Sequence, residues 1–568
     1  MSEHEQYDVV IVGAGPAGCT VGCYLKKYQP NLKIIILDRA SEISLHGGET
    51  LTPNLNAILK ELDLWEAINQ SDWIIKLGTT YRWGKTNSLW DLDSLPKELC
   101  ESLQKNKDQE SLRNHVSFFI DRTEFDKLLQ ERCKALGCII QKDTPVAQIN
   151  HDNQSITALE LKTGETIQAK YYVDASGNVA LFRRFLQLPT FSPFDFSHTF
   201  IWDHWHFSKD FLKGTGLRAQ ILSTPYGWLW QTPITPTRLC IGYACDTEYF
   251  NQSNKAPNRF YLHHLQNEPL FNAFLANGTR EEHIHTYQPH GFIAEQLVGP
   301  NWFLVGDAAS EIDPILNAGI NLAMISAMQC AHTLISLLTE EQDPKWLKDF
   351  CQYFQKRRAL QHHRFATFWY AINKQMSGIQ PKCQKISIDN HLFLNTQDAI
   401  TWLSQDGFIQ ETTEQAGLGG FPLYNVKHLV EKFTDGYLDW EINRNNVFKL
   451  DLTNDTEEKM PFYWRGKVKS IPCYRRGNKL LPDVGPYTAM IQILKEECTV
   501  ERLSKELLAF FKEIRLQQPP KVALLQSFQI LEALITEGWV IAKHDPEKPN
   551  LIITPPSKSE MIHPHGST

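Results

Sequence analysis

Three glycines near the amino end stand at a spacing that could bind a phosphate group. Gly13, Gly15 and Gly18 follow the apolar run 7–12 and precede the helix-compatible segment 19–27. In a strand-turn-helix unit the first glycine permits a tight turn, the second lets the backbone approach a pyrophosphate, and the third lets the helix pack closely on the strand. The pattern predicts a dinucleotide site; the alternative is a glycine-rich turn that only packs a helix on a sheet.

An acidic residue stands where this pattern needs one. A second apolar run, 34–37, ends at Asp38, and Arg39 follows it. A carboxylate about 20 residues beyond the glycines binds the ribose hydroxyls of a dinucleotide. Asp38 and Arg39 are therefore predicted to contact the cofactor.

A second acidic motif indicates which dinucleotide is bound. The apolar run 303–305 leads into Gly306 and Asp307, and a long helix-compatible segment opens at Gly319 and Ile320. This arrangement resembles the ribityl-binding motif of FAD monooxygenases and flavin halogenases. The resemblance implies that Asp307 accepts hydrogen bonds from ribityl hydroxyls, and that the helix N-terminus faces the flavin.

Two further segments resemble motifs of the same family. Residues 121–126 are similar to its arginine-anchored helix start, with Arg122 as the anchor, and residues 172–177 are similar to its second strand-and-turn signature. The four motifs follow one another in the family's order. They imply that the cofactor is FAD and not NAD.

The resemblance extends to residues that would carry halogenation chemistry. Trp228 and Trp230 are close to the W-x-W-x-I-P signature of flavin-dependent halogenases, with Thr232 in place of the isoleucine. Their indoles are expected to wall the passage from flavin to substrate. Lys76 lies on a segment that matches the one bearing the catalytic lysine in halogenases of the phenol, pyrrole and carrier-protein type, and Glu49 is expected to contact the cofactor. The alternative for Lys76 is a solvated side chain beside a strand.

In such halogenases, reduced flavin and dioxygen give a C4a-hydroperoxide, which a halide ion attacks to release hypohalous acid. A lysine such as Lys76 can polarise this acid or form a haloamine. The glutamate of free-tryptophan halogenases is replaced here by Leu316, so the halide is expected on the backbone N–H groups of Ala318 and Gly319. This difference argues against the free-tryptophan type. Glu311 is expected to be an exposed loop carboxylate; the alternative is that it supplies an acid in place of the missing glutamate.

The motifs imply an α/β fold: an FAD-binding, Rossmann-like domain of the p-hydroxybenzoate hydroxylase type, an antiparallel β-sheet substrate domain, and a mainly helical C-terminal region. The order of elements near the C-terminus resembles a winged helix, with a terminal helical cap as the alternative. The expected boundaries are 1–185 and 291–340 for the FAD domain, 186–290 for the sheet, 341–455 for a helical region, and 456–568 for the winged-helix-like unit.

The net charge, the hydrophobic pattern and the cysteine spacing limit which partners and which cellular compartment we expect for the protein. The net charge is −8 over 568 residues and no long basic run exists, which argues against nucleic acid. No run of 18 apolar residues occurs, so no membrane span is predicted. The 12 cysteines form no C-x-x-C pair, which favours reduced thiols in a cytoplasm without a metal site. The basic clusters 356–358 and 362–364 are expected on a solvated helix face.

The sequence therefore predicts a two-component halogenase that uses FAD, a halide ion and dioxygen. No second glycine fingerprint on a strand-turn-helix is visible, so a partner flavin reductase is expected to supply reduced FAD. The substrate is expected to be an electron-rich aromatic compound, either a small molecule or one tethered to a carrier protein or peptide. Three alternatives stay open: an FAD-dependent hydroxylase, a geranylgeranyl-reductase-like FAD reductase, and a catalytically silent flavin-binding scaffold.

Overall fold

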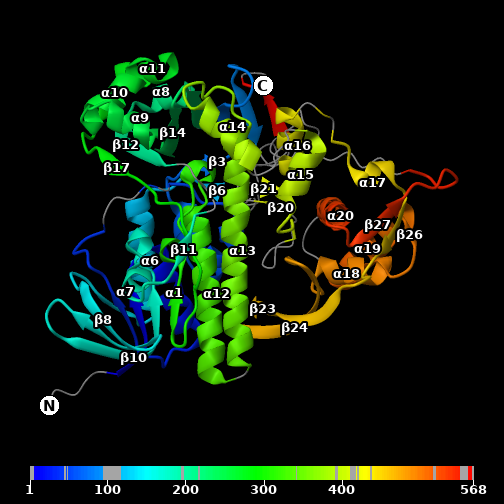
Figure 1. The fold of residues 1–568 in the computed structure, drawn as a ribbon, viewed down its shortest axis with the longest axis horizontal. Coiled ribbons are helices and arrows are strands. Elements are labelled where there is room, and N and C mark those ends of the chain that lie inside the picture. The colour runs from blue at the N-terminus through cyan, green and yellow to red at the C-terminus, as the bar shows by residue number, and fades with distance from the viewer. Residues whose placement is uncertain are drawn as a thin grey trace.

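The computed structural model of the protein has two large sheets, one above the other in the view of Figure 1, a central pair of long helices and a C-terminal unit at one side. The described residues are 6–43, 47, 49–93, 117–192, 197–214, 218–340, 342–389, 395–409, 417–418, 421–434, 436, 438–515, 520–550 and 561–565.

The first sheet carries the glycine fingerprint. Its order is β7-β2-β1-β10-β9-β8, and β19 also pairs with β10. The central strands are parallel, and their apolar residues are buried. Helix α1 packs on β1 and β2 and contacts α6 and the long helix α12 (Gly319–Thr339). The bounds are β1 Gln6–Val12, β2 Ile34–Leu37, β7 Ile139–Gln141, β8 Val146–Asp152, β9 Ser155–Leu161, β10 Thr166–Asp174, β19 Trp302–Leu304, α1 Pro16–Tyr28 and α6 Arg122–Ala135.

The second sheet lies over the first and has the order β16-β12-β15-β14-β13-β4-β5-β28, with β17 paired to β12. Strands β12 to β15 are antiparallel, as predicted, whereas β13 and β4 are parallel. Strands from outside residues 186–290 also join it. The bounds are β4 Gly78–Arg82, β5 Trp90–Asp93, β12 His198–His206, β13 Ala219–Thr224, β14 Gly227–Thr235, β15 Arg238–Asp246, β16 Thr279–Arg280, β17 His285–Tyr287 and β28 Ile562–Pro564.

Helices that the sequence patterns did not predict cover the outer face of this sheet. Aromatic residues of β12, β15 and these helices form a separate core there. Because both faces of β12 are covered, every residue of that strand except its last is buried. The helices are α8 Lys209–Gly214, α9 Thr247–Gln252, α10 Pro257–Gln266 and α11 Pro269–Asn277.

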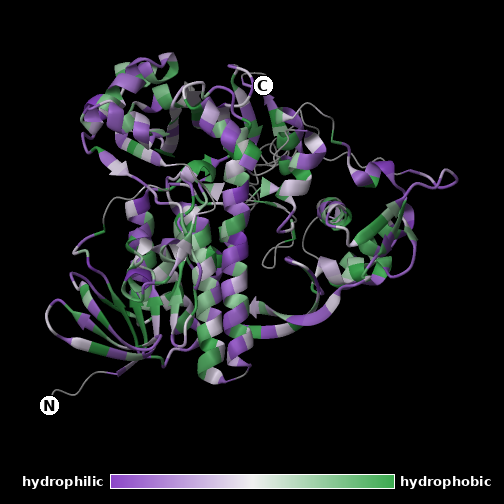
Figure 2. Ribbon diagram, in the orientation of Figure 1, coloured by the Kyte–Doolittle hydropathy of each residue, from purple (hydrophilic) through white to green (hydrophobic). Residues whose placement is uncertain are grey.

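Two long helices, α12 (Gly319–Thr339) and α13 (Pro344–Ala371), run side by side through the centre. Helix α12 is long and apolar enough to cross a membrane, but 72% of its most apolar stretch is buried inside the structure, as in the core helix of a globular fold. Figure 2 shows α12 as largely hydrophobic and α13 as more polar.

The prediction of a solvated basic face on α13 is wrong. Arg357, Arg358, His362 and His363 are all buried. Arg357 donates hydrogen bonds to the carbonyl oxygens of residues 406 and 409, and Arg358 donates to Gln329 of α12. The loop before residue 410 covers this face of the helix. Arg357 therefore binds this loop to α13, and Arg358 binds α12 to α13.

The C-terminal region shares its hydrophobic core with the second sheet. One cluster runs from Tyr81 and Trp83 through α13 and α16 to Leu534 and Ile562. The hairpin β23–β24 extends from α13 toward the helices at the right of Figure 1. The bounds are α14 Gln380–Asp389, α15 Thr396–Leu403, α16 Leu423–Phe433, α17 Glu441–Arg444, β22 Val447–Leu450, β23 Thr456–Trp464, β24 Lys467–Arg476, β25 Lys479–Pro482, α18 Pro486–Leu494, β26 Cys498–Thr499, α19 Val500–Glu513, α20 Pro520–Thr536 and β27 Val540–Lys543.

The elements near the C-terminus include the helices α18, α19 and α20, and the strand β27 follows them. The small sheet beside them has the order β26-β22-β27, so its central strand precedes the helices in the chain. The winged-helix assignment stays a prediction. The remaining short elements are α2 Asn56–Glu61, α3 Trp65–Gln70, β3 Ile75–Lys76, β6 Ser117–Phe118, α7 Leu181–Phe185, β11 Thr190–Phe191, β18 Ile293–Ala294, β20 Gly417–Leu418 and β21 Phe421–Pro422.

Candidate active site

The turn between β1 and α1 needs two of its glycines for packing. Gly13 has a φ of +108°, and a Cβ there would stand 2.2 Å from the carbonyl oxygen of Ala175. A Cβ on Gly18 would stand 1.9 Å from the carbonyl oxygen of Gly13. The fingerprint turn is therefore fitted against the turn after β10, which belongs to the second predicted motif.

Gly15, the second glycine of the pattern, faces open space instead. A Cβ on Gly15 would meet no atom within 4 Å, and Gly15 lines a cavity of about 810 Å³. Asp38 and Arg39 line the same cavity, and the Asp38 carboxylate accepts a hydrogen bond of 3.0 Å from the N–H of Ala14. An open path beside Gly15 at the N-terminus of α1 fits a pyrophosphate.

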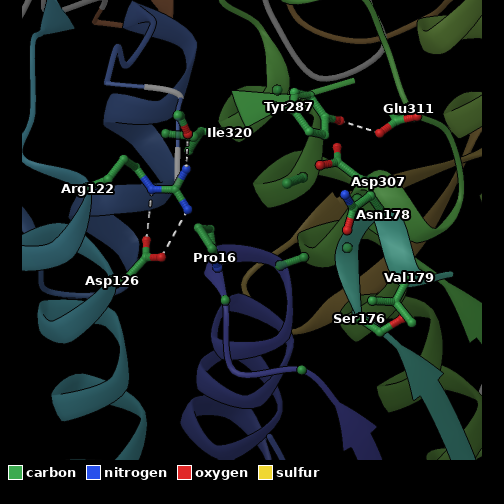
Figure 3. A pocket seen from close by; sticks show the side chains of 18 of the residues that line it. Pro16, Arg122, Asp126, Ser176, Asn178, Val179, Tyr287, Asp307, Glu311 and Ile320 are labelled. Carbon is green, nitrogen blue, oxygen red and sulfur yellow. Dashed lines mark hydrogen bonds and ion pairs between the residues drawn. The ribbon is translucent and has the colours of Figure 1, made fainter. Parts of the chain in front are cut away.

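The cavity continues to Arg122 and Asp307 (Figure 3). Asp121 caps α6 by accepting from the N–H groups of residues 123 and 124, as expected for an arginine-anchored helix start. The Arg122 guanidinium donates to both carboxylate oxygens of Asp126, at 3.1 and 2.9 Å, and to the carbonyl oxygen of Gly47 at 2.7 Å. These bonds hold Arg122 at the cavity wall.

Asp307 lies beside a second carboxylate that the sequence analysis placed wrongly. Glu311 is buried, not exposed, and it accepts hydrogen bonds from the Tyr287 hydroxyl and from the N–H groups of His290 and Gly291 (Figure 3). Its partners come from the end of β17 and from the residues that follow this strand, which local sequence does not reveal. Burial and the Glu311 charge raise the pKa of Asp307 to about 7.

The N-terminus of α12 points into the same cavity. Asp313 caps the preceding turn, Asn317 adopts a left-handed φ of 53°, and α12 starts at Gly319. Gly319 and Ile320 line the cavity, whereas Ala318 is buried and is not among the lining residues. The helix end offers backbone N–H groups and a positive dipole to an anion or to the flavin.

The cavity-facing side of the second sheet carries the two tryptophans. Trp228 and Trp230 line the cavity, with their rings 5.4 Å apart. Trp230 lies opposite Gly242 of β15, where a Cβ would stand 2.2 Å from the indole, so this glycine makes room for the ring. Phe200 and Trp202 of β12 line the same wall.

A buried polar network, which the sequence did not predict, orients Trp228. The Trp228 indole N–H donates to the Tyr370 hydroxyl at 3.2 Å, and Tyr370 donates to Asp313 at 3.1 Å. His198 lies 3.0 Å from the other Asp313 oxygen. Helix α13 thus connects the tryptophan wall to the turn before α12.

Lys76 lies in β3, which pairs with β6 and leads into β4 of the second sheet. Its side chain is half-buried and is not among the residues that line the cavity. Its Nζ lies 5.8 Å from the centre of the Phe119 ring, and no carboxylate pairs with it among the described residues. Burial lowers the pKa of Lys76 to about 8, so a fraction of the amine is neutral near pH 7.

Glu49 lies at the cavity wall in a cluster that no sequence motif indicated. Its carboxylate is 2.6 Å from His204 Nε2, and Cys240 is its other neighbour. The three ligand atoms lie within 4.8 Å of one another, so the cluster could hold a metal ion by ligand type and distance. His204 and Cys240 face each other across β12 and β15.

Comparisons with known proteins agree with this site. The FAD binding domain family matches residues 6–363. A tryptophan 2-halogenase from Chondromyces crocatus is 26% identical over 376 residues, covering 64% of this chain and 68% of that protein. A 1H-pyrrole-2-carbonyl-[peptidyl-carrier protein] chlorinase from Pseudomonas fluorescens is 25% identical over 387 residues, covering 66% of this chain and 85% of that protein.

The fold is shared over almost the whole chain with CmlS, a flavin-dependent halogenase. The TM-score is 0.71 at 18% identity, over 97% of this chain and 98% of CmlS. FAD fits the cavity because Gly15, Asp38, Arg122 and Asp307 all line it. The chain therefore belongs to the FAD binding domain family and is an FAD-dependent oxidoreductase, and the relatives that it matches are flavin-dependent halogenases.

Proposed function

We propose that this protein halogenates an electron-rich aromatic ring and receives reduced FAD from a separate reductase. The observation that carries the proposal is one continuous cavity. It is lined both by Gly15 and Asp38 and by Trp228 and Trp230. A cofactor bound beside Gly15 and Asp38 would therefore share the cavity with an aromatic wall suited to a flat substrate.

FAD supplies the oxidising chemistry when it is bound, reduced and exposed to dioxygen. The chain supplies binding and direction. Asp307 would accept from the ribityl hydroxyls, Arg122 fixes the cavity wall, and the N-terminus of α12 at Gly319, which lines the cavity whereas the buried Ala318 does not, would hold the halide ion through backbone N–H groups. The tryptophan wall separates this end from the substrate.

Lys76 is proposed to direct the active halogen species to the ring. Its lowered pKa gives an amine that can both donate a hydrogen bond and react as a nucleophile near neutral pH. Its segment continues into β4, which pairs with β13 beside the strand of the two tryptophans. This connection supports a lysine that acts from the substrate side of the sheet.

The proposed class of substrate is inferred from the substrates in the names of the similar proteins. Some act on a pyrrole held by a peptidyl carrier protein, by name a chlorinase and a brominase, while another is named a tryptophan 2-halogenase. The glutamate expected in a free-tryptophan halogenase is replaced by Leu316. We therefore propose a phenol, pyrrole or indole ring, free or tethered to a carrier protein or peptide.

The test combines product analysis with variants of Lys76. Purified protein, reduced FAD, bromide and mass-labelled dioxygen are incubated with candidate aromatic compounds. Bromine in the product supports the halogenase, whereas labelled oxygen in the ring would establish the hydroxylase. Lys76→Ala and Lys76→Met should stop bromination of the substrate, while consumption of reduced FAD and release of free hypohalite continue. Bromination at the wild-type rate by both variants would refute the role of Lys76.

A further inference from the structure

The Trp228 indole is bonded to a buried group behind the cavity wall. Trp228 is 4% exposed and lines the cavity, while its N–H donates at 3.2 Å to the hydroxyl of Tyr370, a fully buried residue of α13. Phe200 meets the indole edge-on, with the ring centres 5.4 Å apart. Packing against another ring confines an indole but leaves two orientations about its last side-chain torsion. The hydrogen bond to Tyr370 selects one of them.

The same hydroxyl reaches a second wall of the cavity. Tyr370 donates at 3.1 Å to one carboxylate oxygen of Asp313, and this oxygen also accepts from the N–H of Ile315 at 2.9 Å. The other Asp313 oxygen lies 3.0 Å from His198 Nδ1. Asp313 caps the short turn Pro314–Leu316 that leads into α12, and Ile315 lines the cavity. One tyrosine hydroxyl therefore joins the tryptophan wall to the turn at the N-terminal end of α12.

We infer that Tyr370 is a positioning residue for the proposed halogenation: its hydroxyl fixes the Trp228 indole against the turn before α12, so the active halogen species meets the substrate ring in one geometry. The inference rests on the proposed function. Tyr370 acts through Trp228, because the tyrosine side chain is fully buried. A shift of about 1 Å between reacting groups can lower a rate about 100-fold. An indole that rotates in the wall therefore changes how often, and at which ring carbon, the halogen is transferred.

Removing this hydroxyl breaks two hydrogen bonds but keeps the packing. The Tyr370 ring stacks on His198, with the ring centres 5.0 Å apart and the planes at 28°, and phenylalanine retains that contact. Burial and the charge of Asp313 raise the pKa of Tyr370 well above its ordinary value, so the hydroxyl keeps the proton that it donates. In Tyr370→Phe the Trp228 N–H loses this acceptor, and the indole adopts both orientations.

The direct test is fluorine NMR of the FAD-loaded protein labelled with fluorotryptophan. The resonance that disappears in Trp228→Phe belongs to Trp228. It should be a single line in the wild type, and it should shift and split or broaden in Tyr370→Phe. Tyr353→Phe is the matched control, because Tyr353 lies on the same helix and its hydroxyl donates to the carbonyl oxygen of Asn478 at 2.9 Å. This control should leave the Trp228 line unchanged.

The functional test measures the fraction of consumed reduced FAD that yields a substituted ring, with bromide, mass-labelled dioxygen, and phenol, pyrrole or indole as probes. Tyr370→Phe should bind FAD and oxidise reduced FAD as the wild type does. The fraction should fall about tenfold or more, and substitution should spread over more ring positions. Trp228→Phe should show the same loss, and the double variant should lose no more than Trp228→Phe alone. A tyrosine with a merely structural role would give losses that multiply.

A Trp228 line that is unchanged in Tyr370→Phe, or a double variant in which the two losses multiply, would overturn the inference and leave the halogenase function standing. A Trp228 line that is already split in the wild type would also overturn it, and this measurement does not require Tyr370→Phe to fold. Labelled oxygen in place of bromine in the wild-type product would refute the proposed function. The fluorine spectra would still decide whether Tyr370 fixes the indole.

Discussion

Replacing Lys76 with methionine should stabilise the protein while it removes the amine on which the proposed halogenation depends. The ammonium is half-buried beside the Phe119 ring, and no carboxylate among the described residues pairs with it. A charged group in such surroundings opposes folding. Methionine keeps an unbranched side chain of similar length without the charge.

The lowered pKa sets the magnitude of this effect. The pKa falls from 10.5 to about 8, and one pKa unit corresponds to about 1.4 kcal/mol, so the upper bound is about 3 kcal/mol at pH 7. Because the side chain is only half-buried, we expect about 2 kcal/mol after solvent screening. The folded state binds fewer protons than the unfolded state between pH 8 and 10.5. The wild-type free energy of unfolding therefore rises with pH over this window, and the advantage of Lys76→Met shrinks toward zero at its upper end.

The assay is urea-induced unfolding followed by tryptophan fluorescence at neutral and alkaline pH. Lys449→Met is the matched control, because Lys449 is an exposed lysine in the short strand β22. It should show no gain that depends on pH. A Lys76→Met variant that is no more stable than the wild type at pH 7, or whose gain does not change with pH, would refute the burial of this ammonium and the reasoning built on its pKa.

Three further predictions concern the cofactor site and the C-terminal region. Gly15→Ala should abolish FAD binding but leave the apoprotein folded, as measured by flavin absorbance and circular dichroism. Gly18→Ala should instead destabilise the fold, because its Cβ would stand 1.9 Å from a backbone oxygen. FAD affinity measured by calorimetry should increase as pH rises through about 7, because Asp307 ionises there, and Glu311→Gln should move the midpoint to lower pH; a flat profile would contradict the ribityl role. Deleting residues 456–568 should destabilise the protein, since the deleted part shares a core with the second sheet; a soluble, flavin-binding product would show independent folding.

Local patterns in the sequence predicted the parts of the site that local geometry determines. The glycine turn, the capped start of α6 at Asp121 and the strand that leads to Asp307 each depend only on neighbouring residues. A single sequence is therefore enough to recognise them. Glu311 could not be placed this way, because the groups that bury it come from a segment about 20 residues away. Without these partners, the sequence predicted a solvent-exposed Glu311 carboxylate.

The same limit explains the buried charges and the missed cluster. The basic stretch of α13 has the composition of a surface, and only the contact of Arg357 with a loop about 50 residues later reveals its burial. His204 and Cys240 meet across two strands, and Glu49 joins them from 155 residues away. Sequence alternation along β12 shows that His204 shares a face with Trp202, but the carboxylate partner follows only from the fold.

Because β28 spans Ile562–Pro564, the second sheet is completed late in the synthesis of the chain. It pairs with β5, and His563 contacts Asp93 across a separation of 470 residues. Until residues 561–565 have left the ribosome, the edge of β5 presents unpaired backbone groups, which are prone to join other chains. The cofactor-binding half of the chain is synthesised long before that point. The last strand of the substrate sheet is therefore added to a chain whose cofactor-binding residues have long been available to fold.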